Sequence, residues 1–267
     1  MKFGEKPISE CVGDLLGHSI KTPDGKLSKG TKLSKTHIET LRLIGAKLLL
    51  VASLEEDDVE ENLAASMLSN AFLKSGFKLS VPATGRVNFI ADALSIVRLD
   101  VEKIKSLNEI DEAITFATIM PDQLVTAGQM IATLKIIPYA VSQSSIDAAL
   151  SVISNSDLVS CHTIVSRKFS LIQTSFEDTK PSIIRATEDV TRTRLSHLNC
   201  PLIDSQLTDH TASKVHNALI RARAQGAEAF LLCGASAIAD RLDILPEALR
   251  MVGGEVIHLG LPVDPGN

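Results

Sequence analysis

A loop of small residues that ends in charged side chains is the part of this sequence best suited to chemistry. The loop runs from Gly234 to Asp243 and follows an apolar run. Gly234, Ala235 and Ser236 put no bulky side chain between the backbone and solvent, so a phosphorylated ligand can approach the main-chain N–H groups closely. The composition of this loop therefore predicts a site for an anionic ligand.

Two acids and an arginine close the same loop. The apolar spacing of residues 244–252 predicts a helix, and Asp243 directly before it is the expected N-cap. An anion in the loop would meet the N-terminus of that helix, while a divalent cation or Arg241 would offset the charges of Asp240 and Asp243. The alternative for Arg241 is an ion pair with an acid close to it in the sequence.

A second candidate stretch runs from residue 81 to residue 100. Arg86 follows the flexible Gly85, and its planar guanidinium group is suited to gripping a phosphate or a carboxylate. We expect the small residues here to form a turn that leads into a helix, with Asn88 one turn inside it. The alternative is that Arg86 is a surface residue in a capping loop.

The first half of the chain is expected to mix helices and strands. Asp58 and Glu61 form a predicted capping box at the start of a helix whose apolar stripe includes Leu63 and Met67. We interpret the acids at this helix start as a solvated terminus in preference to a cation site. The other elements expected here are a hairpin around 22–26, a helix beginning at Ser34 or Thr36, strands at 47–53, 114–120 and 130–141, and a helix at 143–153.

Strands and helices alternate regularly after residue 155. Strands are expected at 169–175, 201–204, 229–233 and 255–259, and helices at 183–198, 211–225 and 244–252. This alternation predicts a parallel sheet with helices on both faces, in which ligands bind beyond the carboxyl ends of the strands. Thr174 and the Gly234 loop both follow strands, so we expect them at one cleft. His210 and His216 are not expected to share a metal, because a helix would place them on opposite sides.

Composition excludes several classes of function. A net charge of −5, with one Tyr, no Trp and eight Phe, argues against nucleic acid as a partner. No apolar run approaches the roughly 20 residues of a membrane span, and no signal peptide follows Met1, so we expect a cytoplasmic protein without membrane contact. The four cysteines lie far apart, which indicates reduced, mostly buried thiols and no zinc site.

Several stretches of the chain resemble a known family. Residues from about Phe169 onward resemble the molybdenum-cofactor biosynthesis domain of molybdopterin adenylyltransferases and molybdopterin molybdenumtransferases, and the first part resembles the N-terminal part of bacterial molybdopterin-binding proteins that carry this domain. The stretches that carry the resemblance are Asp57-Asp-Val-Glu-Glu-Asn-Leu-Ala-Ala, Thr84-Gly-Arg-Val-Asn, Lys135-Ile-Ile-Pro-Tyr-Ala-Val, Gly234-Ala-Ser-Ala-Ile-Ala-Asp-Arg-Leu-Asp and Gly260-Leu-Pro-Val-Asp-Pro-Gly-Asn.

The resemblance implies an α/β fold and a division of the chain. It implies an α+β N-terminal region over residues 1–165 and a three-layer α/β/α domain with a mostly parallel sheet over residues 166–267. That domain looks truncated, since the sequence stops at Asn267 inside what resembles a motif. We expect a longer parent protein, with further secondary structure and a nucleotidyltransferase domain beyond this point.

The resemblance also assigns site residues. Gly234, Ser236 and Asp243 match the family's glycine-rich loop with its downstream acid, and Pro265-Gly266 matches its second ligand loop. This chain departs from the usual pair of adjacent glycines, since Ala235 follows Gly234, and its spacing leaves Asp240 or Asp243 as the counterpart of the family's acid.

Two functions are compatible with these features. The first is an enzyme of molybdenum-cofactor assembly that binds molybdopterin and transfers an adenylyl group from ATP, or molybdate, with Asp243 assisted by Asp240 holding Mg²⁺. The second is a non-catalytic module that binds or delivers the pterin cofactor, which the Ala235 substitution favours. A homo-oligomer is expected in either case, because the related families form dimers or trimers.

Overall fold

The chain folds into two compact units, Met1–Thr163 and Ile164–Asn267. A computed structural model describes residues 1–23, 25–72, 75–154 and 157–260. The class is mixed α/β, as expected from the sequence. Most strand pairs in the described ranges are antiparallel, and the parallel pairs belong to the second unit. No helix in these ranges is long and apolar enough to cross a membrane.

The first 53 residues form a small antiparallel sheet with one α-helix. Strands β1 (Lys2–Pro7), β5 (Leu48–Ser53) and β2 (Leu15–Leu16) pair in that order, and η1 (Ile8–Glu10) joins β1 to β2. Strands β3 (Ile20–Thr22) and β4 (Gly25–Leu27) form the expected hairpin. Helix α1 (Lys35–Leu43) begins after Ser34, whose Oγ accepts from the amide of His37, so the expected cap is confirmed.

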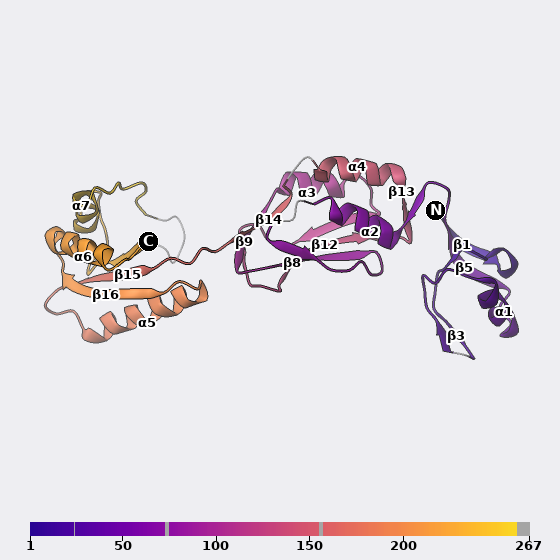
Figure 1. Cartoon of the computed structure of the whole chain (residues 1–267), viewed down its shortest axis with the longest axis horizontal. Helices are drawn as coiled ribbons and strands as arrows, with labels where there is room; N and C mark the ends of the chain where they lie inside the picture. Colours follow the sequence, from indigo (N-terminus) through magenta and orange to yellow (C-terminus); the bar gives the residue numbers. More distant parts are fainter. Residues whose placement is uncertain (24, 73–74, 155–156, 261–267) are drawn as a thin grey trace. The chain divides into compact units, whose positions relative to one another are not determined.

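The rest of the first unit packs three helices against antiparallel sheet. One sheet has the order β10 (Ile114–Thr118), β12 (Met130–Ile136), β8 (Arg86–Ala91) and β7 (Phe77–Leu79). A second contains β11 (Leu124–Val125), β9 (Ser95–Leu99) and β14 (Val159–Thr163), and β13 (Ala140–Ser142) pairs with β6 (Asp58–Glu60). Helices α2 (Glu61–Asn70), α3 (Val101–Asn108) and α4 (Gln143–Ser154) lie on one side of the first sheet (Figure 1).

Aromatic rings hold this part of the first unit together. Phe89 lies 4.9 Å from Phe72 and 5.3 Å from both Phe77 and Phe116 between ring centroids. All four side chains are buried. Edge-to-face and tilted packing of this kind adds to the stabilisation that burial of the rings already provides.

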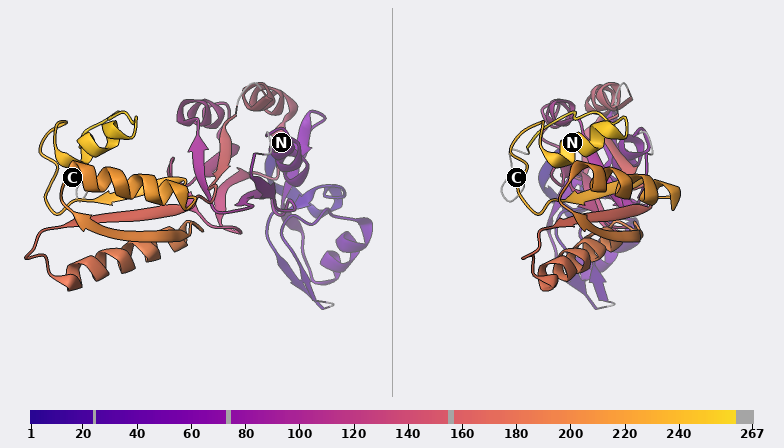
Figure 2. Two further views of the ribbon diagram at one scale, coloured as in Figure 1. Left: turned by 60° about the vertical axis from the view of Figure 1, so that its left-hand side comes forward. Right: turned by 90° about the vertical axis from the view of Figure 1, so that its left-hand side faces the viewer.

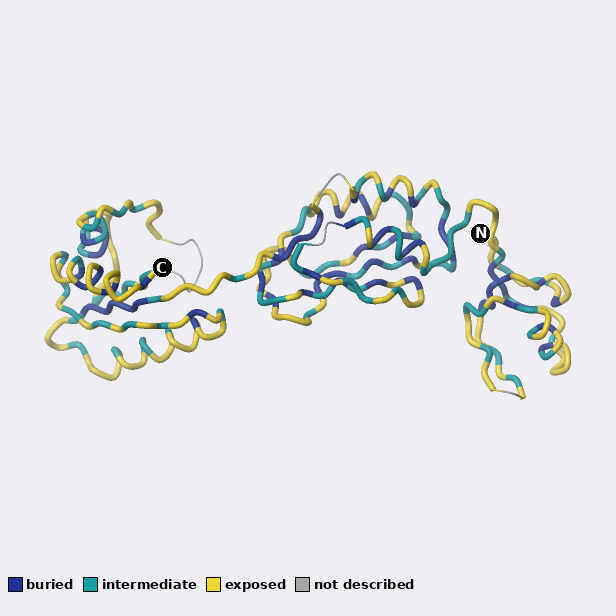
Figure 3. Tube along the Cα trace, viewed as in Figure 1, coloured by how far each residue is buried: buried dark blue, intermediate teal, exposed yellow. Residues whose placement is uncertain are grey.

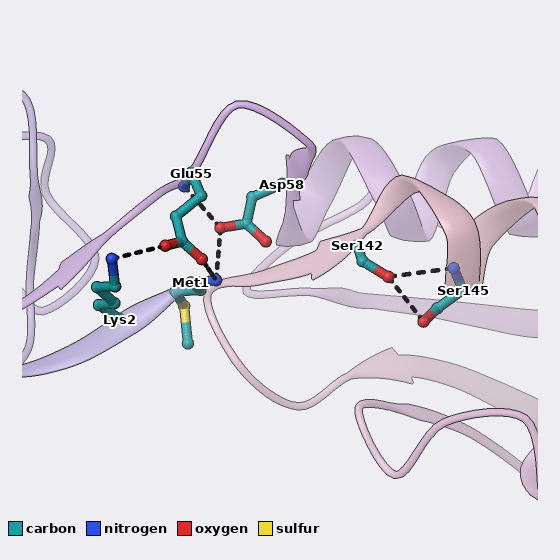
Figure 4. Close-up of polar contacts among 6 residues, drawn as sticks. All are labelled: Met1, Lys2, Glu55, Asp58, Ser142 and Ser145. Atoms are coloured by element: carbon teal, nitrogen blue, oxygen red, sulfur yellow. Dashed lines mark hydrogen bonds and ion pairs between the residues drawn. The ribbon is translucent and has the colours of Figure 1, made fainter.

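The predicted start of helix α2 is wrong. Asp58 lies in β6, paired with Ser142, and its carboxylate accepts from the N-terminal ammonium of Met1 and from the amide of Glu55, both at 2.7 Å (Figure 4). The cap is Glu60, whose Oε2 accepts from the amide of Leu63 at 3.2 Å. The strand pairing holds Asp58 in extended backbone, so the helix can begin only after residue 60.

Helix α2 buries only part of the predicted apolar stripe, since Met67 packs against the core but Leu63 does not. Leu63 is 56% exposed, whereas Ala64, Ala65 and Leu68 are fully buried. The helix also turns two alanines toward the sheet, because small side chains let its backbone approach β8 and β12 closely.

The helix expected after Arg86 is a pair of strands, β8 and β9. Val87, Phe89 and Ala91 are buried and alternate with the more exposed Arg86 and Asn88, which is the period of a strand. Pairing of β8 with β12 and β7 supplies the hydrogen bonds that favour the strand.

The second unit is built on a parallel sheet. Strand β15 (Phe169–Ser175) lies between β16 (Leu202–Asp209) and β17 (Ala229–Cys233). Helix α5 (Pro181–His197) covers one face, and α6 (Ala212–Ala224) and α7 (Ile244–Met251) cover the other (Figure 2). The central strand is buried while α5 is mostly exposed (Figure 3). Because both neighbours of β15 run parallel to it, all three strands end at the same edge of the sheet.

Two expectations for the second unit are corrected. The strand expected at 201–204 continues to Asp209, because pairing with β15 runs from Phe169 to Ser175 along its whole length. Residues 255–259, expected as a strand, form neither a strand nor a helix.

Candidate functional site

Three loops of the second unit meet at the carboxyl edge of its parallel sheet. Thr174 lies at the end of β15, His210 directly follows β16, and Gly234 directly follows β17. Strand register brings them together, since Thr174 is the neighbour of Thr208 on β16 and Gln173 is the neighbour of Cys233 on β17. This edge is where ligands bind in open sheets of parallel strands.

A chain of hydrogen bonds joins these loops. The amide of Ala235 donates to Thr174 Oγ1 at 2.8 Å, and the same oxygen lies 2.8 Å from His210 Nδ1. On the other side of the imidazole ring, His210 Nε2 lies 3.1 Å from Ser236 Oγ. Thr174 is only 3% exposed, whereas Ser236 at the other end of the chain lies at the surface.

The proton positions along this chain follow from the hydrogen bonds. Thr174 Oγ1 accepts from Ala235 and has one proton to give, and within the described ranges His210 Nδ1 is the acceptor it reaches. We therefore assign the ring proton of His210 to Nε2, which donates to Ser236 Oγ. With this assignment the hydroxyl proton of Ser236 is free to donate to a ligand.

The loop after β17 requires a glycine at its first position. A Cβ on Gly234 would lie 2.7 Å from the carbonyl oxygen of Ser236 and 3.2 Å from Leu245 Cδ1, because the loop folds back on itself. The amides of Ser236, Ala237 and Ile238 donate to no group in the described part of the chain. These amides are therefore available to an acceptor beyond the described residues, such as a ligand.

Asp243 caps helix α7, as expected from the sequence. Its Oδ1 accepts from the amide of Ile244 at 2.7 Å and its Oδ2 from the amide of Ala239 at 3.0 Å. These two amides hold the pKa of the Asp243 carboxyl below its ordinary value. Each carboxylate oxygen keeps a second lone pair, so the group can still accept a cation.

Asp240 is a weaker candidate for a metal ligand than Asp243. Its Oδ1 accepts from the amide of Leu242 at 2.8 Å, which shapes the turn before α7. Across the residues that the structure describes, no group of three or more His, Cys, Asp or Glu side chains is placed to hold a metal ion. A Mg²⁺ ion at Asp240 and Asp243 would need water and ligand phosphate for its remaining positions, which is its usual coordination in nucleotide-binding sites.

Arg241 does not form the ion pair that was the alternative for it. Its Nη1 donates to the carbonyl oxygen of Val256 at 2.7 Å, and its own carbonyl oxygen accepts from Arg250. Arg250 in turn pairs with Glu247. Arg241 therefore ties the segment after α7 to the loop that contains Asp240 and Asp243.

A pocket of about 430 Å³ opens beside the hydrogen-bond chain. Its lining includes Thr174, Phe176, Asp178 and Lys180 after β15, and Gly234 and Ala235 after β17. The first turn of α5 also borders the pocket, with Pro181 at its first position and no side chain capping its amides. Lys180 and Asp178 bring one cation and one anion to the pocket, and the positive end of the 17-residue helix α5 favours an anion there.

The other predicted site residues lie elsewhere. Arg86 belongs to the first unit, where it is exposed at the start of β8 opposite Lys135, so it takes no part in the site that the second unit forms by itself. Pro265 and Gly266 lie outside the described residues.

His210 is the site residue that sequence reasoning set aside. Its position follows from the full length of β16. The polar residues Ser205 and Gln206 led us to expect a strand that ended at residue 204. The available signal was the pair Asp209-His210, which lies directly before a predicted helix. Polar residues between a strand and a helix were also the reason for choosing Thr174.

Comparisons with known proteins leave the family open. No protein-family profile matches the chain, and no curated protein matches it. Among solved structures, the chain has a likeness to NadC from Streptococcus pyogenes, with 12% sequence identity and a TM-score of 0.20 over 64% of this chain and 66% of that one. The chain thus spans just under two thirds of NadC, and a likeness this weak carries no argument about fold or function.

Proposed function

We propose that the second unit binds molybdopterin through its terminal phosphate and serves molybdenum-cofactor biosynthesis. The observation that carries the proposal is the chain Thr174–His210–Ser236, which ends in a hydroxyl donor beside free loop amides and the pocket that Lys180 lines. Hydroxyl groups, amides, a lysine and a helix N-terminus are the groups that bind phosphate monoesters in proteins. The sequence resemblance supplies the identity of the ligand.

The architecture of the second unit supports this proposal. A parallel sheet with helices on both faces, as in the three-layer α/β/α domain of the resembled family, binds ligands beyond its strand ends. The pocket lies at that edge. The departure at Ala235 is compatible with binding, because this residue avoids positive φ and its amide serves Thr174.

Binding without catalysis is the first form of the proposal, and transfer is the second. For transfer, Asp243 and Asp240 would hold Mg²⁺, which when bound neutralises charge on the phosphates of ATP or on molybdate. Asp243 is ionised and retains lone pairs, so it fits this role. Both aspartates already serve the turn and cap before α7, which favours the binding module.

The test separates binding from turnover. Purified protein is incubated with molybdopterin, with and without Mg·ATP and molybdate, and retained pterin, adenylylated product and inserted molybdenum are measured. Retention alone supports the binding module, and retention with product supports the transferase. If no molybdopterin is retained, both forms of the proposal fail.

Two variants sharpen this test. Asp243→Asn keeps a capping side chain but removes the charge, so a transferase loses rate far more than affinity. Asp189→Asn, on the exposed outer side of α5, is the matched control and should leave retention and rate unchanged.

A further inference from the structure

Phe176 is an exposed aromatic side chain at the mouth of the pocket. It lies in the loop after β15, is 50% exposed and lines the same cavity as Lys180 and Ala235. Aromatic side chains normally gain stability by burial, as the four rings at the core of the first unit do. An aromatic ring that borders a polar pocket and stays half exposed is a candidate contact for a ligand ring.

The ring of Phe176 is held in place before any ligand arrives. It packs edge-to-face on His210, with ring centroids 5.1 Å apart and ring planes 72° apart. His210 is itself fixed at both ring nitrogens by Thr174 and Ser236.

The backbone of Phe176 is fixed as well. Its amide donates to Thr179 Oγ1 at 2.9 Å, and its carbonyl oxygen accepts from the amide of Thr179 at 3.1 Å. A ring that is oriented in advance loses little conformational entropy when a second ring stacks on it.

We propose that Phe176 is a stacking platform for the ring of a phosphorylated fused-ring heterocycle, a pterin or a purine. This inference rests on the proposed function, because the phosphate of the same ligand would lie at Ser236 and Lys180. The pocket volume of about 430 Å³ is that of a small-molecule site and leaves room beyond a phosphate group. Lys180 and Phe176 line one cavity, and Ser236 directly follows Ala235 at its border, so one ligand can use all three.

If Phe176 is a stacking platform, the protein should bind ligands that carry a heterocyclic ring more tightly than ligands that lack one. Stacking of a heterocycle on an aromatic side chain changes affinity by on the order of tenfold. A ligand without a ring gains only the phosphate contacts. Removing the π face of Phe176 should therefore weaken ring-bearing ligands and spare the ligand that lacks a ring.

The experiment compares three phosphate monoesters by calorimetry: neopterin monophosphate, AMP and ribose 5-phosphate. Each is titrated into the wild type, Phe176→Leu, which keeps apolar volume, and Phe176→Tyr, which keeps the π face. Phe3→Leu is the matched control, since Phe3 is 52% exposed and stacks on Tyr139 in the first unit. Circular dichroism and a urea midpoint verify that each variant is folded.

The expected result is a loss of about tenfold for at least one ring-bearing ligand in Phe176→Leu, with ribose 5-phosphate unchanged and both Phe176→Tyr and Phe3→Leu close to the wild type. Loss confined to neopterin monophosphate identifies a pterin site, and loss confined to AMP identifies a purine site. The platform is overturned if Phe176→Leu binds all three as the wild type does, or loses all three equally, while phosphate binding by the unit still stands. A wild type that binds none of the three overturns the phosphate site and the platform together.

Discussion

The amide of Ala235 and the Oγ1 of Thr174 meet at 2.8 Å across 61 residues of sequence. This hydrogen bond joins the loop after β17 to the end of β15. It also engages the buried hydroxyl oxygen of Thr174, which lies 2.8 Å from His210 Nδ1. One side chain therefore fixes both the shape of the loop and the orientation of the imidazole ring.

The first prediction concerns this hydroxyl group. Thr174→Val keeps the shape of the side chain but leaves the amide of Ala235 and Nδ1 of His210 without their partner. We expect the free energy of unfolding to fall by about 1–3 kcal/mol, the cost of leaving a buried polar group unsatisfied. Urea denaturation measures it. Thr174→Ser keeps the hydroxyl and should lose less than half as much, and equal losses in both variants would contradict the role of the hydrogen bond.

The second prediction concerns Gly234. A methyl group there would approach the carbonyl oxygen of Ser236 to 2.7 Å, so Gly234→Ala must shift the loop. We expect a loss of about 1–3 kcal/mol in unfolding free energy, typical of overpacking, and weaker binding of phosphate ligands. Gly4→Ala is the control, because its Cβ would meet nothing within 4 Å. A Gly234→Ala protein as stable as the control would show that the loop is free to move.

The third prediction concerns pH. The pKa of Asp243 is lowered in the folded protein, chiefly by the amides of Ala239 and Ile244. A carboxyl group whose pKa is lowered by folding contributes stability above its unfolded pKa, near 3.8, and loses that contribution as pH falls through the folded value. The stability advantage of the wild type over Asp243→Asn should therefore shrink below about pH 4, as followed by urea midpoints from pH 7 to pH 3. A difference that does not change with pH would contradict this account.

The fourth prediction concerns the thiols. Cys11, Cys161 and Cys200 are buried, whereas Cys233 is only partly buried and lines the pocket. Burial also raises the pKa of Cys11 and Cys161, which lowers their thiolate fraction at pH 7. We expect one cysteine to react with iodoacetamide well before the others, and mass spectrometry should identify it as Cys233.

Two comparisons complete the thiol test. Cys233→Ser should abolish the fast phase, and a bound phosphorylated heterocycle should slow it in the wild type. Fast labelling of Cys200 in the native protein would show that the sheet of the second unit opens more readily than its packing indicates.

Local features of the sequence determined many elements of this fold. The apolar run of β15, the strand β17 and the caps Ser34 and Asp243 are set by residues within a few positions of each other, because propensity and capping are short-range effects. The small residues at 234–236 likewise marked a loop that the structure places beside a pocket.

Tertiary pairing decided the rest. Asp58 became a strand residue because Ser142 lies opposite it, and the stretch after Arg86 became strands because β12 supplies its hydrogen bonds. His210 reached the site only because β16 follows β15 along its full length. A sheet partner distant in sequence can override local preference, since each strand residue gains its hydrogen bonds from another strand and not from its own segment.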